Sequence, residues 1–207
     1  MIEVLDPEPH DAALNMAIDE ALLHTATAPT LRIYRWVRPA VSFGYFGKWT
    51  DAAQAASHRE IVRRWTGGGI VPHGDDVTYS LIVPRAHPFF GVSPRESYCA
   101  IHERIAAALG DAILAATVAP QTSHACFENP VLHDVLMGSR KVAGAAQRRS
   151  KCGLLHQGSI QIAGDPDRIA NAFATRRSSV PLSADILDSA LRLSREKYAN
   201  ETWTQRR

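Results

Sequence analysis

The segment 63–69, which reads RRWTGGG, has residue types suited to binding an anionic or carbonyl group. Three consecutive glycines cost backbone entropy on folding, so such a run is typical of a backbone that adopts unusual dihedral angles or approaches a ligand closely. Free N–H groups in the loop can bind an anion, and the two arginines can neutralise its charge. Neither GxGxxG nor GxxxxGK[ST] is present. The alternative interpretation is a flexible hairpin tip with solvated arginines.

His73 follows the glycines in the loop sequence PHGDD. An isolated histidine in such a loop is more often a turn residue than a ligand or a base, although its position beside the glycines favours a functional role. Asp75 and Asp76 predict a turn. Because no further carboxylate or histidine lies at ligand spacing, we predict no metal site.

Lys141 begins the segment KVAGAAQRR, in which Gly144 and Ala145 belong to a run of small residues. A solvated turn lysine is the commoner interpretation. The small residues nevertheless leave room beside the lysine for an elongated apolar ligand with a polar head.

Cys126, in the loop sequence HACFENP, follows His124 and is either an activated nucleophile or an inert small hydrophobe. The other two cysteines are Cys99 and Cys152, and no CxxC spacing occurs. This sparse, odd set indicates neither a disulfide framework nor a structural zinc site.

The composition of the 207 residues excludes several classes of protein. With 45% apolar and 21% charged residues, the chain predicts an ordinary globular fold with one core. A net charge of +2 is too small to predict nucleic acid or an anionic membrane as a partner. No apolar run approaches the ~18 residues of a spanning helix, and the N-terminus lacks a signal-peptide pattern. We therefore expect a cytoplasmic protein with no membrane or nucleic-acid partner.

Capping residues and periodicity predict the elements that position these side chains. Asp11 caps a helix to about Thr25, with its polar residues on the face opposite an apolar stripe, and Ser93 opens another helix. Two short strands join at Pro39, and the segment 60–84 predicts a hairpin around the glycine-rich loop. The later elements are a helix over 50–59, an antiparallel meander of strands over 131–137, 141–149 and 153–163, and helices capped by Asp165 and Ser183.

Strands in adjacent runs without intervening helices argue against a doubly wound parallel fold. The fold class predicted is therefore α+β, with helices packed on a mixed, largely antiparallel sheet.

Taken together, segments along nearly the whole chain resemble the biotin/lipoate protein ligase superfamily, in its lipoate-protein ligase A and octanoyltransferase branch. The glycine loop followed by the RKVAG lysine is the most specific part of this resemblance. The segments are LNMAIDEALL (14–23), 31–46, RRWTGGGIVPHGDDVTYSLIVP (63–84), HDVLMGSRKVAGAAQRR (133–149), LLHQGSIQI (154–162) and 197–207.

This resemblance implies a catalytic domain of the class II aminoacyl-tRNA synthetase and biotin ligase type over 1–207, with no C-terminal accessory domain. It also implies a tunnel for an octanoyl or lipoyl chain. Lys141 matches the lysine that contacts the activated acyl carbonyl, where an ammonium can stabilise a developing oxyanion. Cys126 resembles the nucleophile of the octanoyltransferases. The residues matched to the acyl or adenylate group are Arg64, Thr66, Gly67, Gly68, Gly69, His73, Gly144 and Ala145.

Three functions are compatible with the resemblance. The favoured one is transfer of an acyl group from a thioester, such as an acyl carrier protein, to the lysine of a lipoyl carrier domain through Cys126. That carrier would be of the 2-oxoacid dehydrogenase E2 type or the glycine cleavage H protein type. The alternatives are a lipoate-protein ligase, which would need ATP and Mg²⁺, and a lipoyl-binding module without catalysis.

Overall fold

The structure is a computed structural model that describes residues 1–116, 130–162, 165–173 and 178–206. The strands are β1 (Ile2–Leu5), β2 (Thr30–Tyr34), β3 (Ala40–Phe43), β4 (Glu60–Arg63), β5 (Ile70–His73), β6 (Val77–Pro84), β7 (Ile113–Leu114), β8 (Val135–Met137), β9 (Arg140–Arg149), β10 (Gly153–Ile160) and β11 (Ser178–Pro181).

These strands form a large sheet, with the order β11-β1-β2-β6-β10-β9-β8-β7, and a small sheet, with the order β4-β3-β5. In the large sheet β1 is parallel to β2 and β11, and the other neighbours are antiparallel. The prediction of an α+β fold on a mixed, largely antiparallel sheet is confirmed.

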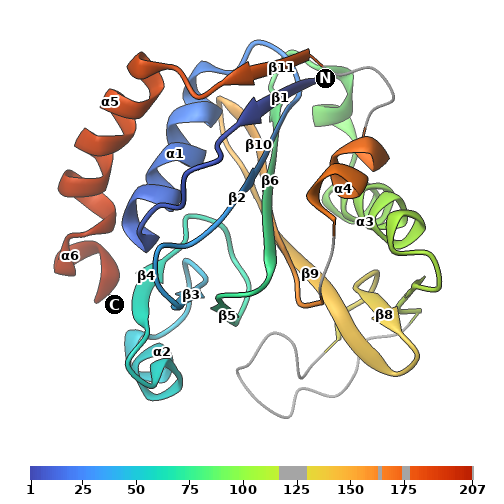
Figure 1. Ribbon diagram of the computed structural model, residues 1–207, viewed down its shortest axis with the longest axis horizontal. Coiled ribbons are helices and arrows are strands. Elements are labelled where there is room, and N and C mark those ends of the chain that lie inside the picture. The colour runs from blue at the N-terminus through green and yellow to red at the C-terminus, as the bar shows by residue number, and fades with distance from the viewer. Residues whose placement is uncertain (117–129, 163–164, 174–177, 207) are drawn as a thin grey trace.

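Helices cover both faces of the large sheet. In Figure 1, the N-terminal helix and the C-terminal helices lie on one side, and the two helices from the middle and later parts of the chain lie on the other. None of the described helices is long and apolar enough to cross a membrane. The helices are α1 (Ala12–Thr25), α2 (Trp49–Ala56), the 3₁₀ turn η1 (Pro88–Gly91), α3 (Pro94–Leu109), α4 (Pro166–Phe173), α5 (Ala184–Leu193), the π-helical turn η2 (Ser194–Tyr198) and α6 (Glu201–Thr204).

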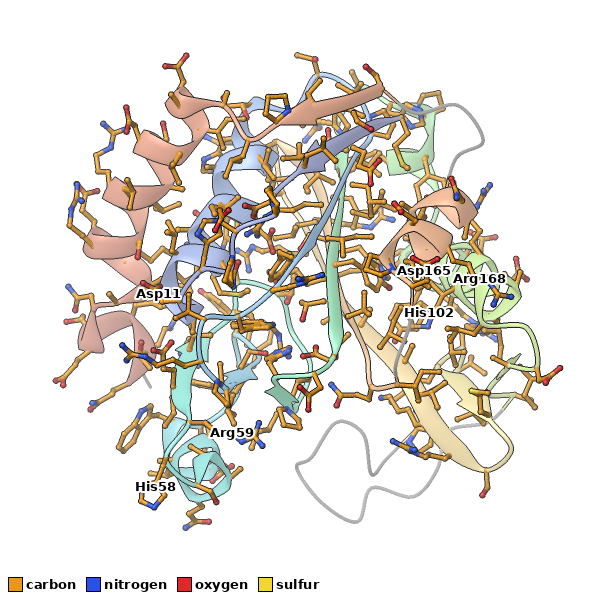
Figure 2. All side chains as sticks on the ribbon, in the orientation of Figure 1. Asp11, His58, Arg59, His102, Asp165 and Arg168 are labelled. Atoms are coloured by element: carbon orange, nitrogen blue, oxygen red, sulfur yellow. The ribbon has the colours of Figure 1, made fainter. Side chains whose placement is uncertain are left out.

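The predicted caps begin the helices where the sequence places them. The Asp11 side chain accepts a hydrogen bond from the Leu14 N–H at 2.7 Å, at the start of α1 (Figure 2). Ser93 and Glu96 form a complete capping box at the start of α3, and Ser183 caps α5. These bonds satisfy backbone N–H groups that no helical carbonyl can reach.

The predicted hairpin over 60–84 is wrong. β4 pairs parallel to β3, and β5 pairs antiparallel to the other edge of β3, whereas β6 belongs to the large sheet. The chain therefore crosses the end of β3 between β4 and β5. This crossing needs close backbone contact, because a Cβ on Gly44 would lie 2.0 Å from the Gly68 carbonyl oxygen.

The sequence prediction also missed three short strands and made a fourth strand too long. β1, β7 and β11 have four residues or fewer and were not predicted. The strand expected over 131–137 is confined to β8, because His133 adopts a left-handed φ of 68°.

Both faces of α1 are buried, although its polar residues were expected opposite the apolar stripe. Asn15 and Asp19 are fully buried against the sheet. There they contact the Arg32 guanidinium, which donates to Asn15 Oδ1 at 2.6 Å, to Asp19 Oδ1 at 2.8 Å and to Asp6 Oδ2 at 2.8 Å. An ion of this size is tolerated in a core only when its donors are satisfied.

Two histidines, His102 on α3 (labelled in Figure 2) and His156 on β10, lie in the core with their rings in contact. His102 donates from Nδ1 to the His133 carbonyl at 2.7 Å, and His156 bonds Tyr79 and Gln147 at 3.1 Å each. Burial disfavours the imidazolium, which lowers the pKa of His102 to about 4 and the pKa of His156 well below its usual value.

These histidines predict an acid-sensitive fold. Between about pH 6.5 and 4 the unfolded chain binds protons on both residues and the folded chain does not, so stability must fall as the pH falls. We expect the free energy of unfolding to decrease by about 1.4 kcal/mol per pH unit for each histidine. Urea unfolding followed by circular dichroism from pH 7 to 5 measures this slope.

Removal of one core histidine isolates its contribution to the slope of the free energy of unfolding against pH. His102→Gln is expected to flatten the slope, whereas replacement of the exposed His58 by Asn is expected to leave it unchanged. An equal slope in the His102 and His58 variants would contradict this account.

Candidate functional site

A pocket lies where the small sheet meets the large one. The space that no protein atom fills, with the open mouth included, is about 410 Å³. Five of the predicted site residues line it. The lining residues are Met16, Tyr34, Trp36, Ser42, Arg64, Gly68, Val71, His73, Thr78, Gly144, Ala145, Ala146, Gln157, Gly158 and Ser159.

Arg64 holds the glycine loop in place. Its Nη2 donates to the carbonyls of Gly67 and Gly69 at 2.9 Å each, and its Nη1 donates to Ser42 Oγ at 2.8 Å. Arg64 is buried, with an exposed fraction of 6%. The interpretation of this segment as a flexible tip with solvated arginines is therefore wrong.

The neighbouring Arg63 has a structural role, because it bonds backbone carbonyls outside the glycine loop. Its Nε, Nη1 and Nη2 atoms donate to backbone carbonyls, and these bonds employ all five of its N–H groups. The guanidinium thus ties residues 203–206 to residues 45–47 and has no donor left for a ligand, contrary to the expectation that both arginines neutralise an anion. The acceptors are the carbonyls of Tyr45, Gly47, Trp203, Thr204 and Arg206, at 2.8–3.2 Å.

The loop leaves backbone donors available. Among the described residues, nothing accepts a hydrogen bond from the N–H groups of Gly67, Gly68 or Gly69, while the Gly67 and Gly69 carbonyls are bonded to Arg64. Gly68 has a φ of +86°, in the region that favours glycine. Donors held in this way can stabilise negative charge on an oxygen atom without reorganising.

Thr66 connects the loop to the core. Its hydroxyl, fully buried, donates to Gln157 Oε1 at 2.8 Å, and Gln157 Nε2 donates to Asp19 Oδ2 at 2.8 Å. Thr66 therefore fixes the loop and does not line the pocket.

His73 is a buried residue at the end of β5, not the turn residue that its loop suggested. Its Nε2 lies 2.7 Å from Ser42 Oγ, and its Nδ1 lies 2.9 Å from Asp76 Oδ2. The Asp76 side chain is 1% exposed and also accepts from Thr78 and Ser159. The prediction that Asp76 only forms a turn is wrong.

Lys141 is also buried, with an exposed fraction of 4%, so its interpretation as a solvated turn lysine is wrong. Its Nζ lies 2.7 Å from Asp134 Oδ2, a buried carboxylate that also accepts from the Tyr98 hydroxyl at 2.6 Å. The ammonium lies directly behind the pocket wall. A Cβ on Gly144, which lines the pocket, would be 2.8 Å from Nζ.

The predicted residues thus gather around one pocket. Arg64, Gly68, His73, Gly144 and Ala145 line it. Thr66, Gly67, Gly69 and Lys141 lie directly behind these residues, through the contacts described above. Cys126 lies outside the described residues. Among the described residues, no group of three or more His, Cys, Asp and Glu side chains could hold a metal ion.

Sequence reasoning missed Ser42, Asp76 and Gln157. The alternation of side chains along a strand could have revealed Gln157, since residues at even spacing share one face of a strand. His156 points into the core, so Gln157 and Ser159 must point to the opposite face, where the pocket lies.

Gly68 provides a test of the loop geometry. We expect Gly68→Ala to lower the free energy of unfolding by about 1–2 kcal/mol, since the alanine would adopt a left-handed conformation. Its Cβ would also lie 3.1 Å from Arg64 Nη2. Urea unfolding measures the loss.

Gly67→Ala is the matched control, because a Cβ there meets no atom within 4 Å. We expect this variant to be as stable as the parent or more stable. Equal losses in the two variants would contradict the geometry.

Comparison of the sequence with known proteins identifies relatives of the same kind. The octanoyltransferase LipM of Oceanobacillus iheyensis is 36% identical over 82% of this chain and 67% of its own length. LipM of Kyrpidia tusciae is 36% identical over 91% of this chain and 73% of its own length. LipM of Bacillus subtilis is 35% identical over 78% of this chain and 65% of its own length. The matched part of the chain thus corresponds to about two thirds of these relatives.

Solved structures share the fold. A Thermoplasma acidophilum protein assigned as a lipoate protein ligase, with bound lipoic acid, has a TM-score of 0.78 at 20% identity and covers 99% of this chain and 98% of its own. A lipoate-protein ligase A bound with ATP has a TM-score of 0.75 at 20% identity over the same shares of the two chains. The model of the lipoyl protein ligase A/B catalytic domain matches residues 11–192. With the fold, this match and relatives at 36% identity, the chain belongs to the lipoyl protein ligase A/B catalytic domain family.

Proposed function

We propose that this protein transfers an octanoyl or lipoyl group to the lysine of a lipoyl carrier domain, of the E2 or H protein type. The observation that carries the proposal is a pocket with apolar residues, including Trp36 and Val71, beside the N–H groups of the glycine loop, from which no described residue accepts a hydrogen bond. Such a pocket suits an acyl chain that ends in a carbonyl. Relatives named octanoyltransferase support the acyl group.

The donor in this proposal is an acyl thioester, such as an acylated acyl carrier protein. The Cys126 thiolate attacks the acyl carbon, the donor thiolate leaves, and the acyl group is held as a thioester on the enzyme. The neutral amine of the carrier lysine then attacks the same carbon, the bond to the Cys126 sulfur breaks, and the proton lost by the nitrogen passes to that sulfur as the amide forms. Exchange between two thioesters is nearly isoenergetic, so this route needs neither ATP nor Mg²⁺.

The glycine loop and Lys141 stabilise the oxyanion that forms in each step. Loop N–H groups are held rigidly by Arg64, and the Lys141 ammonium is held by Asp134 on the other side of the pocket wall. Removing one donor of this kind typically costs about 10²–10³-fold in rate.

The test measures the intact mass of a lipoyl carrier domain after incubation with the protein. We expect octanoyl gain from octanoyl-acyl carrier protein without ATP, loss of that gain in Cys126→Ala, and a rate about 100-fold lower in Lys141→Ala. Cys99→Ala and Lys151→Ala are the matched controls, since Cys99 lies on α3 away from the pocket lining and Lys151 is exposed. Lipoyl gain only from free lipoate with ATP and Mg²⁺, unaffected by Cys126→Ala, would instead make the protein a ligase.

Gly144 tests the position of the lysine. A Cβ at this residue would lie 2.6 Å from Lys141 Cε, so Gly144→Ala must displace the ammonium. A displacement of about 1 Å in a catalytic group can cost 10²-fold, and we expect a fall of that order in the transfer rate. Gly91→Ala, whose Cβ meets no atom within 4 Å, is the control. Undiminished transfer by a folded Gly144→Ala would remove Lys141 from the mechanism.

A further inference from the structure

One group of side chains in the pocket has no task in the proposed transfer. Ser42 Oγ lies 2.7 Å from His73 Nε2, and His73 Nδ1 lies 2.9 Å from Asp76 Oδ2. Ser42 and His73 line the pocket, and both are buried away from bulk solvent. A hydroxyl, an imidazole and a carboxylate in this order are the components of a serine nucleophile with its general base.

The protonation states follow from the partners. Burial raises the pKa of Asp76, but hydrogen bonds from His73, Ser159 and the Gly74 N–H hold this pKa at about 2. Asp76 is therefore an acceptor, so His73 Nδ1 is the donor in their bond, and with Nδ1 as donor the Nε2 atom is placed to accept from the Ser42 hydroxyl. Proton transfer from Ser42 to His73 can occur along this bond.

The Ser42 oxygen retains the capacity to attack. It donates its proton to His73 and accepts one hydrogen bond from Arg64 Nη1 at 2.8 Å, which leaves one lone pair. The guanidinium also stabilises the alkoxide that forms as the proton departs.

The surrounding structure holds the histidine ring in this orientation. The ring stacks on Trp36 with a centroid distance of 4.2 Å and an interplanar angle of 20°. Asp76 is held by bonds from Thr78 at 2.8 Å and Ser159 at 2.7 Å. Precise placement of this kind is what a catalytic group requires.

Donors for an oxyanion lie close to the nucleophile. One guanidinium, that of Arg64, bonds both Ser42 Oγ and the carbonyls of Gly67 and Gly69. The glycine loop is therefore adjacent to Ser42, and its N–H groups bond no acceptor in the part of the chain that the structure describes. Gly68 and Ser42 also line the same pocket.

We propose that Ser42, His73 and Asp76 form a second acyl-accepting centre, which hydrolyses activated acyl esters and thioesters bound in this pocket. Ser42 is the nucleophile, His73 the general base and Asp76 the residue that orients His73. This activity goes beyond transfer to a carrier, because water is the final acceptor.

The hydrolysis proceeds in two balanced steps. Ser42 Oγ bonds to the acyl carbon while its proton moves to His73 Nε2, and the bond to the leaving alkoxide or thiolate breaks as that group takes the proton. Water then gives a proton to His73 and bonds to the acyl carbon. The ester bond to Ser42 breaks, Oγ recovers the proton, and a free carboxylic acid leaves.

The test measures hydrolysis of p-nitrophenyl octanoate from the release of p-nitrophenolate, with the uncatalysed rate subtracted. Cys126→Ala is the parent in every assay, so that no thiol at that position contributes, and no carrier domain is added. We expect Ser42→Ala and Asp76→Asn, each in this parent, to lower kcat about 100-fold or more. Ser189→Ala, in the same parent, removes a hydroxyl on α5 outside the pocket and is expected to change nothing.

A second measurement does not depend on the Ser42 variant folding. Treatment of the Cys126→Ala protein with an octyl fluorophosphonate, followed by peptide mass spectrometry, should place the phosphonyl group on Ser42, and Asp76→Asn should slow this labelling. Equal hydrolysis with and without Ser42, or labelling at another residue, would overturn the proposal. Neither result depends on transfer to a carrier, so the two proposals fail independently.

Discussion

The buried Arg32 guanidinium is the interaction on which the positions of the other elements depend. It lies on β2 of the large sheet, is fully buried, and is satisfied by Asp6, Asn15 and Asp19. Removing one partner would leave a buried charge without compensation, which commonly costs about 3–5 kcal/mol. This requirement fixes α1 against β2 and explains why a helix with buried polar residues packs on the sheet.

Asp19 extends this constraint to the functional site. Its carboxylate accepts from Arg32, Tyr34, Ser80 and Gln157, which belong to three strands of the large sheet. Gln157 in turn accepts from Thr66 at the start of the glycine run. A continuous series of buried hydrogen bonds therefore runs from the core to the loop, so the loop is positioned by the large sheet although its flanking strands belong to the small one.

The pocket is built from glycines, whose backbone is conformationally free, but neighbouring side chains hold these glycines in fixed positions. Glycines allow the loop to cross Gly44 closely, and Arg64 fixes the carbonyls of Gly67 and Gly69, while the loop N–H groups bond none of the described residues. On the other side of the pocket wall, Gly144 gives Lys141 the space that a side chain would fill. Preorganised donors of this kind stabilise developing charge better than water, which must reorient.

The sequence alone determined the features that depend on residues close together in the chain, such as the starts of helices. Asp11, Ser93 and Ser183 each bond an N–H three residues later, so the starts of α1, α3 and α5 could be predicted. The glycine run and Lys141 were recognisable because their residue types and order are unusual. Tertiary structure decided the rest. Whether β4 pairs with β3 or with β6 depends on contacts between distant residues. The pairing of β3 with β5 in the small sheet brings Ser42 to His73, and packing of the glycine loop against the large sheet brings Thr66 to Gln157. A local pattern states which residues share a face but not what that face meets.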